Sequence, residues 1–343
     1  MTLKMRMLQT DRQTDRNSIA FIKLLAALQV FMGHACIHLN TPDVPKYLFP
    51  FYSMLQGVPI FFILSGFLIW NSIARTDNFS VFVKKRVFRL YPELWGGVLL
   101  SFVVILVLYG SRIEWIPYLA FQVTQGSFLQ FWTPDFLRGY GCGTPNGSLW
   151  TICVMLQAYI VMWLLYRFLH GKKAIFWGIF NVVCIALSFT PRLLSSFLPE
   201  LICKLYNQTF VPYLWLFVLG MTLCEFFGTL IPFLKRFWYV FALIAAVLCL
   251  TGWDISGSYS VFKSLMMAPA IIGFAYRFPK LQIKQDFSYG LYIYHMIVIN
   301  VMIHFGFVGN PLYVLVAFTI SSLLAVLSYK TIGSIGRKRR KAL

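Results

Sequence analysis

Uninterrupted apolar runs of about 20 residues recur along most of this 343-residue chain and constrain its fold more than any other feature. As a helix, a run of that length matches the roughly 30 Å hydrocarbon core of a bilayer. Hydrophobic residues make up 59% of the sequence and charged residues 12%, whereas an ordinary soluble domain carries roughly 25% charge. These proportions exclude a soluble globule and a disordered chain. The sequence predicts an all-α, polytopic membrane helical bundle whose first partner is the lipid bilayer.

Ten runs qualify as transmembrane helices, and one further stretch is ambiguous. That stretch, residues 115–131, is short and is interrupted by Pro117, Gln122, Gln125 and Gly126, so a span and a re-entrant piece both remain open. The ten predicted spans lie near residues 18–39, 52–73, 94–110, 148–167, 174–190, 209–227, 237–253, 260–276, 287–306 and 311–330.

The positions of the basic residues predict the topology. The net charge of +19 would suggest nucleic acid in a soluble protein, but in a membrane protein Lys and Arg concentrate on the cytoplasmic side. With ten spans and a cytoplasmic N-terminus, most of the 30 Lys and Arg residues fall in inner segments. Counting 115–131 as a span would place the basic tail from Arg337 to Lys341 outside. We therefore predict about ten spans, both termini cytoplasmic, and no nucleic-acid partner.

The domain organisation is predicted to be simple. The chain shows no internal repeat and no linker long enough to separate domains, so we expect a single membrane domain over residues 1–343. Short basic cytoplasmic tails are expected at 1–17 and 331–343. The seven cysteines are odd in number and mostly lie inside apolar runs, which indicates small buried side chains rather than disulfides. No metal site is expected.

Two ionisable residues lie inside the first predicted span, where a charge is costly unless it is paired or hydrated. Lys23 and His34 are eleven residues apart, which on a helix places them on one face with about 16.5 Å between their levels. Taken alone, Lys23 is also consistent with a lysine that snorkels to the interface, and His34 with a packed, hydrogen-bonded histidine. The shared face makes the pair a stronger functional candidate than either residue.

Arg86 and Arg89 follow the second predicted span at i, i+3 spacing. On a helical turn both guanidinium groups point the same way, and each can bind a phosphate group bidentately. The alternatives are a positive-inside anchor and a contact with anionic lipid.

Two polar motifs open later spans. Residues 146–151 read NGSLWT, in which Ser148 is a plausible helix cap and Trp150 an interfacial tryptophan. Residues 288–295 read SYGLYIYH, and here the tyrosines, Tyr294 among them, fit an aromatic belt, while His295 is also consistent with a core residue.

Together these segments resemble the acyltransferase-3 membrane family, in order and spacing, over roughly residues 16–305. The resemblance implies an acyl-CoA-dependent O-acyltransferase, most often an O-acetyltransferase, in a multi-pass bacterial inner membrane location. It also implies an acceptor hydroxyl on an extracytoplasmic polysaccharide or lipid-linked glycan, as in exopolysaccharide biosynthesis. The matching segments are Lys23 with His34, residues 58–69 (VPIFFILSGFLI), 86–92 (RVFRLYP), 146–151 and 288–295.

The resemblance also implies roles for individual residues. His34 is expected to be the catalytic base, because imidazole titrates near neutral pH, with Lys23 as the second catalytic residue. Arg86 and Arg89 are expected to hold the phosphates of acetyl-CoA or another acyl-CoA, while Lys23 guides its pantetheine arm. Contacts to the acceptor are expected from Ser148, Trp150, Tyr294 and His295. The acyl-CoA is a donor substrate, and no tightly bound cofactor is expected.

Three positions depart from the family pattern and keep other functions open. Met155 stands where the family usually has a carboxylate, Ala20 stands where an Asp is common, and Lys23 replaces the more usual Arg. The first two changes remove an acid. The alternatives are therefore a transporter or flippase for a lipid-linked glycan, which would be expected to show related halves, and a catalytically degenerate scaffold of the same fold.

Overall fold

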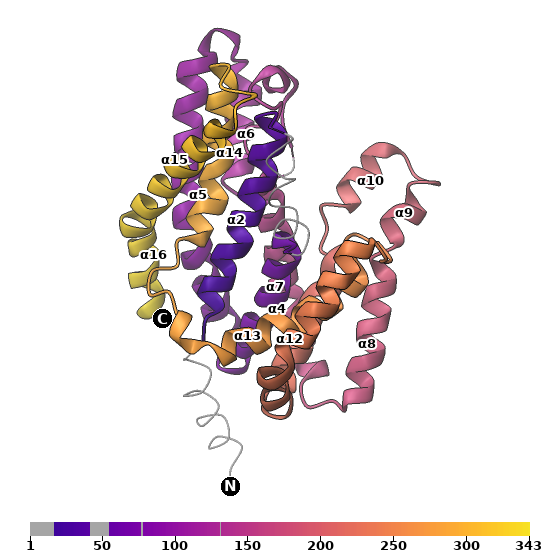
Figure 1. Ribbon diagram of the computed structural model, residues 1–343. Helices are drawn as coiled ribbons and strands as arrows, with labels where there is room; N and C mark the ends of the chain where they lie inside the picture. The colour runs from indigo at the N-terminus through magenta and orange to yellow at the C-terminus, as the bar shows by residue number, and fades with distance from the viewer. Residues whose placement is uncertain (1–16, 42–54, 77, 131) are drawn as a thin grey trace. The chain divides into compact units, whose positions relative to one another are not determined.

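The computed structural model describes residues 17–41, 55–76, 78–130 and 132–343. Within these ranges the regular elements are helices, with one isolated bridge between Ser256 and Ser260 (Figure 1). The predicted all-α class is confirmed. Backbone groups in a hydrocarbon core must be bonded within their own segment, and a helix does this for every apolar run.

Seven described helices are long and apolar enough to cross a membrane, where the sequence predicts ten. The other three predicted spans coincide with the shorter helices α11 (Leu214–Glu225), α13 (Val261–Arg277) and α14 (Ser288–His304), which have 12, 17 and 17 residues. At 1.5 Å per residue, 17 residues cover about 26 Å, slightly less than a hydrocarbon core. The seven candidates are Ile19–His38, Gly57–Ala74, Phe79–Arg112, Gly147–Leu169, Ala174–Leu194, Phe227–Thr251 and Pro311–Lys341.

The chain forms two compact units. Helices α2 (Ile19–His38) and α7 (Trp150–Leu169) each begin in one unit and end in the other. The single membrane domain expected from the sequence stays a prediction. The first unit comprises Met1–Ala26, Ser53–Ala74 and Ala158–Asp286, and the second comprises Ala27–Tyr52, Arg75–Gln157 and Phe287–Leu343.

In the first unit, two glycines let helices α4 and α11 pack closely. A Cβ on Gly66 would collide with the backbone of Phe217, and one on Gly220 would collide with the backbone of Ile63. Small residues at such positions are how membrane helices gain packing contacts in the absence of a hydrophobic driving force. The helices of this unit, beyond α11 and α13, are α4 (Gly57–Ala74), α8 (Ala174–Leu187), α9 (Thr190–Leu194), α10 (Glu200–Tyr206), η4 (Val211–Tyr213), α12 (Phe227–Thr251) and η5 (Pro279–Leu281).

Glu225, at the end of α11, is the main polar tie of the first unit. Its carboxylate accepts hydrogen bonds from Trp70 Nε1 at 2.7 Å and from the Gly171 backbone at 2.7 Å. His170 Nδ1 lies 3.1 Å from the same carboxylate. A buried acid needs such partners, so Glu225 is satisfied structurally and fastens the α7–α8 turn to α4 and α11.

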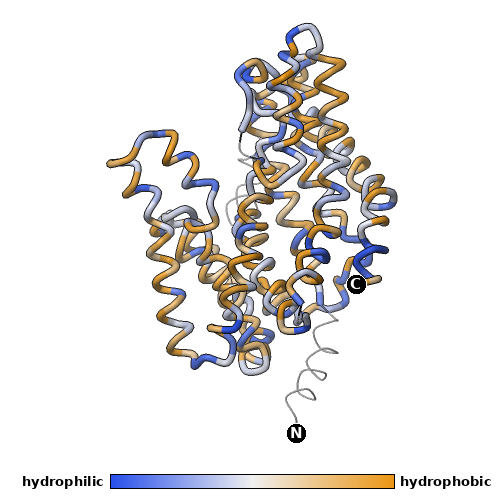
Figure 2. The backbone as a smooth tube through the Cα atoms, turned by 180° about the vertical axis from the view of Figure 1, so that it is seen from behind, coloured by the Kyte–Doolittle hydropathy of each residue, from blue (hydrophilic) through white to orange (hydrophobic). Residues whose placement is uncertain are grey.

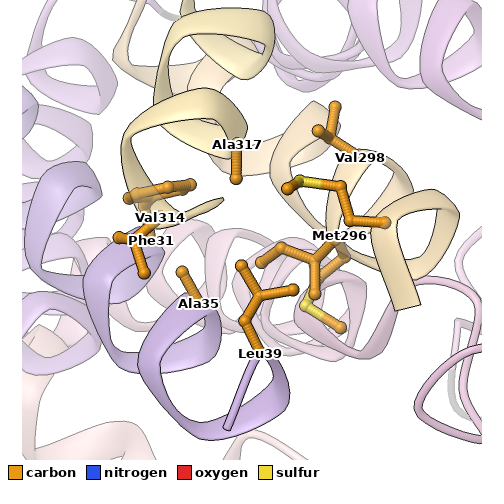
Figure 3. Packing of buried hydrophobic residues seen from close by; sticks show 9 residues of the cluster. Phe31, Ala35, Leu39, Met296, Val298, Val314 and Ala317 are labelled. Carbon is orange, nitrogen blue, oxygen red and sulfur yellow. The ribbon is translucent and has the colours of Figure 1, made fainter. Parts of the chain in front are cut away.

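In the second unit, the C-terminal half of α2 packs against α14 and α15. Phe31 and Ala35 of α2, with Leu39 directly after it, pack in a cluster with Met296 of α14 and Val314 of α15 (Figure 3). This apolar packing fixes the faces that α2 and α14 present to one another. The other helices of the unit are α5 (Phe79–Tyr109), η1 (Gly110–Arg112), α6 (Trp115–Gln125), η2 (Asp135–Gly139), η3 (Gly147–Leu149), α15 (Pro311–Lys330) and α16 (Ile332–Lys341).

The ambiguous stretch 115–131 contains helix α6, which has only 11 residues. Its Tyr118 hydroxyl donates to Phe102 O at 2.6 Å, and farther along Gly126 O accepts from Trp95 Nε1 at 2.8 Å. The chain then returns, because the Tyr140 ring lies 5.7 Å from the ring of Tyr109, at the end of α5. The segment therefore leaves and re-joins the same end of α5, as a re-entrant piece does, and α6 covers about 16 Å.

Candidate active site

The most distinctive polar contact of the second unit joins two histidines. His34 Nδ1 on α2 lies 2.7 Å from His295 Nε2 on α14, and the two rings are stacked with centroids 5.0 Å apart. His295 is fully buried and His34 is half-buried. The sequence predicts both residues as site residues, with separate roles. The structure brings them together as one pair.

The hydrogen bonds of the pair determine which nitrogen carries each proton. His295 Nδ1 lies 3.1 Å from Leu291 O, and because a carbonyl only accepts, this nitrogen must donate. In the neutral ring His295 Nε2 is then an acceptor, so His34 Nδ1 must donate to it. The remaining nitrogen, His34 Nε2, keeps its lone pair. The contact thus orients His34 as a proton acceptor at Nε2.

The 146–151 motif supports the α14 segment that carries His295. Asn146 Nδ2 donates to Ile293 O at 2.8 Å, and Ser148 Oγ donates to Asn146 Oδ1 at 2.7 Å. The Tyr292 hydroxyl donates to Ser148 O at 2.9 Å and lies 2.8 Å from Thr151 Oγ1. The motif therefore holds Ile293 and Tyr292, which lie two and three residues before His295, through buried hydrogen bonds, which are rigid in a low-dielectric interior.

The four residues expected to contact the acceptor have different surroundings. Ser148 is 1% exposed and its hydroxyl is engaged inside the protein. Tyr294 is also buried, and its hydroxyl donates to Ser328 Oγ at 3.0 Å on α15. Trp150 is half-buried at the start of α7, and His295 pairs with His34. Acceptor contacts by these residues stay predictions.

Asn300 is a buried polar residue that the sequence reading did not single out. It is fully buried, its Oδ1 accepts from Cys142 N at 2.7 Å, and its Nδ2 donates to Pro145 O at 2.9 Å. It thereby ties α14 to the loop that leads into the 146–151 motif. The available signal was an amide inside an apolar run, where an unbonded polar group is costly.

Cys142 lies in that loop, and its thiol is not a nucleophile near neutral pH. Burial raises the pKa of its thiol above the ordinary value, and burial raises the pKa of the neighbouring Tyr140 to about 12. Both groups are therefore protonated near neutral pH, and a thiol reacts as its thiolate. All seven cysteines are free.

A small pocket opens beside the 146–151 motif in the second unit. Its polar lining combines amide and hydroxyl groups, which are the groups that bond to sugar hydroxyls. The lining residues are Gly97, Val98, Ser101, Phe121, Gln122, Gln125, Pro145, Asn146 and Leu149.

Lys23 lies on α2 as predicted but belongs to the first unit. Its Nζ lies 2.8 Å from Asp286 Oδ2, and the two side chains are 14% and 23% exposed. The sequence reading did not identify Asp286, which is 263 positions away. Asp286 supplies the carboxylate that pairs with Lys23 in the first span. In relatives, an acid at the position of Ala20 would be well placed to form the same pair. Lys23 is thus an ion-paired residue rather than only a snorkelling one.

Met155 is half-buried. It packs against the cluster that contains Leu94, Leu149 and Ile293. At the position where the family usually has a carboxylate, this chain therefore packs a thioether side chain against apolar neighbours. The flexible methionine side chain packs well in such an irregular apolar setting.

Arg86 and Arg89 lie on the first turns of α5, as the i, i+3 spacing predicts. Arg86 is half-buried with its guanidinium 5.5 Å from the centroid of Phe82, and Arg89 is exposed. Among the described residues no group of three or more His, Cys, Asp or Glu is arranged to hold a metal ion.

Comparisons with known proteins identify the family of the chain. The profile of an acyltransferase domain matches residues 16–330. Nodulation protein 10 of Rhizobium leguminosarum bv. viciae is 27% identical over 356 aligned residues, which cover 96% of this chain and 95% of that protein. An O-acetyl transferase of Shigella phage Sf6 is 28% identical over 309 residues, which cover 84% and 87%. No solved structure matches. The profile covers nearly the whole chain, and the chain therefore belongs to the acyltransferase-3 family.

Proposed function

We propose that this membrane O-acyltransferase moves an acyl group, in the first instance acetyl, from acyl-CoA to a hydroxyl of an extracytoplasmic or lipid-linked glycan. The family and the O-acetyl transferase relative support the reaction class. The observation that carries the proposal is the contact between His34 Nδ1 and His295 Nε2. It leaves a basic nitrogen on a half-buried side chain inside a span, where an unused polar group would be costly.

The proposed reaction uses His34 as general base. The acceptor oxygen attacks the thioester carbonyl while His34 Nε2 takes the hydroxyl proton. The tetrahedral intermediate then expels the coenzyme A sulfur, which receives that proton, so that an ester and a free thiol are formed. His295 acts as a positioning residue, because its Nε2 accepts from His34 Nδ1 and stabilises the imidazolium while it carries the extra proton.

Substrate binding is proposed on the same elements. Arg86 and Arg89 bind donor phosphates, since a guanidinium binds phosphate bidentately. Lys23, held in position by its ion pair with Asp286, guides the pantetheine arm of the donor.

The proposed membrane arrangement is that of a bacterial inner membrane protein with both termini cytoplasmic. The return of the 115–131 stretch to the same end of α5 supports a non-spanning segment there. Topology reporters check this arrangement: a fusion after Arg138 should read outside, and fusions after Lys173 and Lys341 should read inside. A fusion after Lys173 that reads outside would make 115–131 a true span.

Labelled acetyl-CoA tests the reaction itself. Inverted membrane vesicles that contain the chain should move label into glycan or lipid-linked glycan, and vesicles with His34→Ala should not. His38→Ala is the matched control, because His38 lies one helical turn away on α2 and its ring is 6.0 Å from that of His34. Movement of glycan across the membrane without label incorporation would favour the flippase.

A further inference from the structure

The last helix of the chain, α16, packs on the helix that carries the predicted phosphate-binding arginines. Two glycines allow the close approach: a Cβ on Gly336 would collide with Phe88 O, and a Cβ on Gly333 would lie 2.7 Å from Glu93 Oε1. Arg339 places its guanidinium 5.7 Å from the centroid of Phe88. The hydrophilic colour of α16 contrasts with the apolar helices around it (Figure 2).

The packing brings arginines of the two helices together. Arg340 shares the face of Gly333 and Gly336, at i+7 and i+4. It is half-buried and lies within electrostatic range of Arg89 and Arg337, which both repel it. Arg337 is held in place, since its guanidinium stacks 3.6 Å from the centroid of Tyr329 and donates to Tyr329 O at 2.6 Å.

The local charge is strongly unbalanced. Arg86, Arg89, Arg337 and Arg340 form what we call the arginine cluster, and Glu93 is the single carboxylate on α5 and α16. Glu93 lies beside Arg337, because a Cβ on Gly333 would be close to both side chains. Arginines therefore outnumber carboxylates on these two helices. Arg86, Arg337 and Arg340 are half-buried, and Arg89 is exposed.

We propose that α16 completes the donor site, with Arg340 and Arg89 together binding a phosphate group of acyl-CoA. The proposal rests on the proposed function, which places donor phosphates on Arg86 and Arg89. A polyanion that carries three phosphate groups suits arginines drawn from two packed helices, whereas a positive-inside anchor needs only charges spread along the interface. Mutual repulsion between Arg340, Arg89 and Arg337 is relieved by a bound phosphate, which accepts bidentate hydrogen bonds.

Binding of coenzyme A to the purified full chain in phosphatidylcholine nanodiscs tests the proposal. Arg340→Ala should weaken the affinity for coenzyme A about 10-fold or more, the usual effect of losing a charged hydrogen bond. Arg340→Lys should recover only part of it, because an ammonium lacks the planar fork. Lys338→Ala is the matched control, since Lys338 is exposed and lies about 200° around α16 from Gly336, and its affinity should stay within about twofold.

The arms of the experiment separate the possible failures. Unchanged coenzyme A affinity in Arg340→Ala, with weakened binding in Arg89→Ala, overturns this inference and leaves the proposed function standing. Unchanged affinity in both variants also removes the proposed donor site. Loss of bound phosphatidylglycerol from Arg340→Ala in mixed nanodiscs, with coenzyme A affinity intact, makes the cluster a lipid headgroup site and overturns the inference. If Arg340→Ala does not fold, the affinity of Arg340→Lys decides.

Discussion

Helix α2 carries two polar pairs of very different character. In the first unit Lys23 meets Asp286 in an ion pair, and in the second unit His34 meets His295 in a hydrogen bond between rings. The ion pair cancels two opposite charges that a membrane would disfavour. The histidine pair has no charge to cancel, yet it fixes a lone pair on His34 Nε2. An ionisable residue in a span is therefore structural or chemical according to what its partner leaves available.

The comparison predicts different losses when each pair is broken. Removing one member of an ion pair leaves an uncompensated charge, which lowers stability first. Removing the base of a proton transfer leaves the fold largely intact, which lowers the rate first. Four substitutions test this difference.

The largest effect is expected from His34→Ala. A general base contributes about 10²- to 10⁴-fold in rate, so acetyl transfer should fall by at least 100-fold. The variant should still insert and be purified in normal yield, because a half-buried imidazole contributes little packing. The measurement is transfer from labelled acetyl-CoA per mole of folded protein. Near-normal transfer by a folded variant would contradict the role of His34.

Met155→Glu measures how much stability an unpaired charge costs in the second unit. The side chain packs on the apolar cluster around Leu94, Leu149 and Ile293, so a carboxylate there should cost about 3 kcal/mol. We expect low accumulation and an early thermal unfolding transition, with Met155→Leu as the volume-matched control. A well-folded Glu variant with raised transfer would show instead that the site retains a place for the family's carboxylate.

The helices were the most predictable part of this protein. A run of apolar residues forms a helix in a membrane whatever surrounds it, so each of the ten predicted spans coincides with one. The residues at which the helices begin and end were less predictable. For example, α11 is short because η4 (Val211–Tyr213) precedes it and α12 follows directly after Phe226. The breakers Pro117 and Gly126 correctly marked the 115–131 stretch as unusual.

The candidate site residues stand out one at a time in the sequence, but the contacts between them do not. His34, Lys23 and Arg89 each stand out locally, as a charge in a span or a repeated arginine. Their partners lie far along the chain, His295 at 261 positions from His34 and Asp286 at 263 positions from Lys23. Arg340 looked like a topology signal, because a basic tail fits the positive-inside rule equally well. Only packing between distant helices distinguishes these roles.

Lys23→Met breaks the ion pair with Asp286. We expect stability to fall by about 2 kcal/mol, between the values for exposed and buried pairs. Asp286→Asn should cost a similar amount, and the double variant Lys23→Met with Asp286→Asn should recover much of the loss, since no lone charge then remains. Thermal unfolding of the three variants measures this. A stable double variant that has lost kcat, and not only affinity for acetyl-CoA, would give Lys23 a part in the chemistry and weaken the contrast between the two pairs.

The smallest effect is expected from His295→Gln. The Gln side-chain oxygen can still accept from His34 Nδ1 and keep the lone pair on His34 Nε2, but an amide stabilises the imidazolium less well than a ring nitrogen. We therefore expect kcat to fall about tenfold, a change of about 1.4 kcal/mol, with the KM for acetyl-CoA unchanged. His295→Leu offers no acceptor and should lose more of kcat. Equal losses in folded Gln and Leu variants, or a raised KM in both, would mean that His295 fills space or contacts substrate rather than orienting His34.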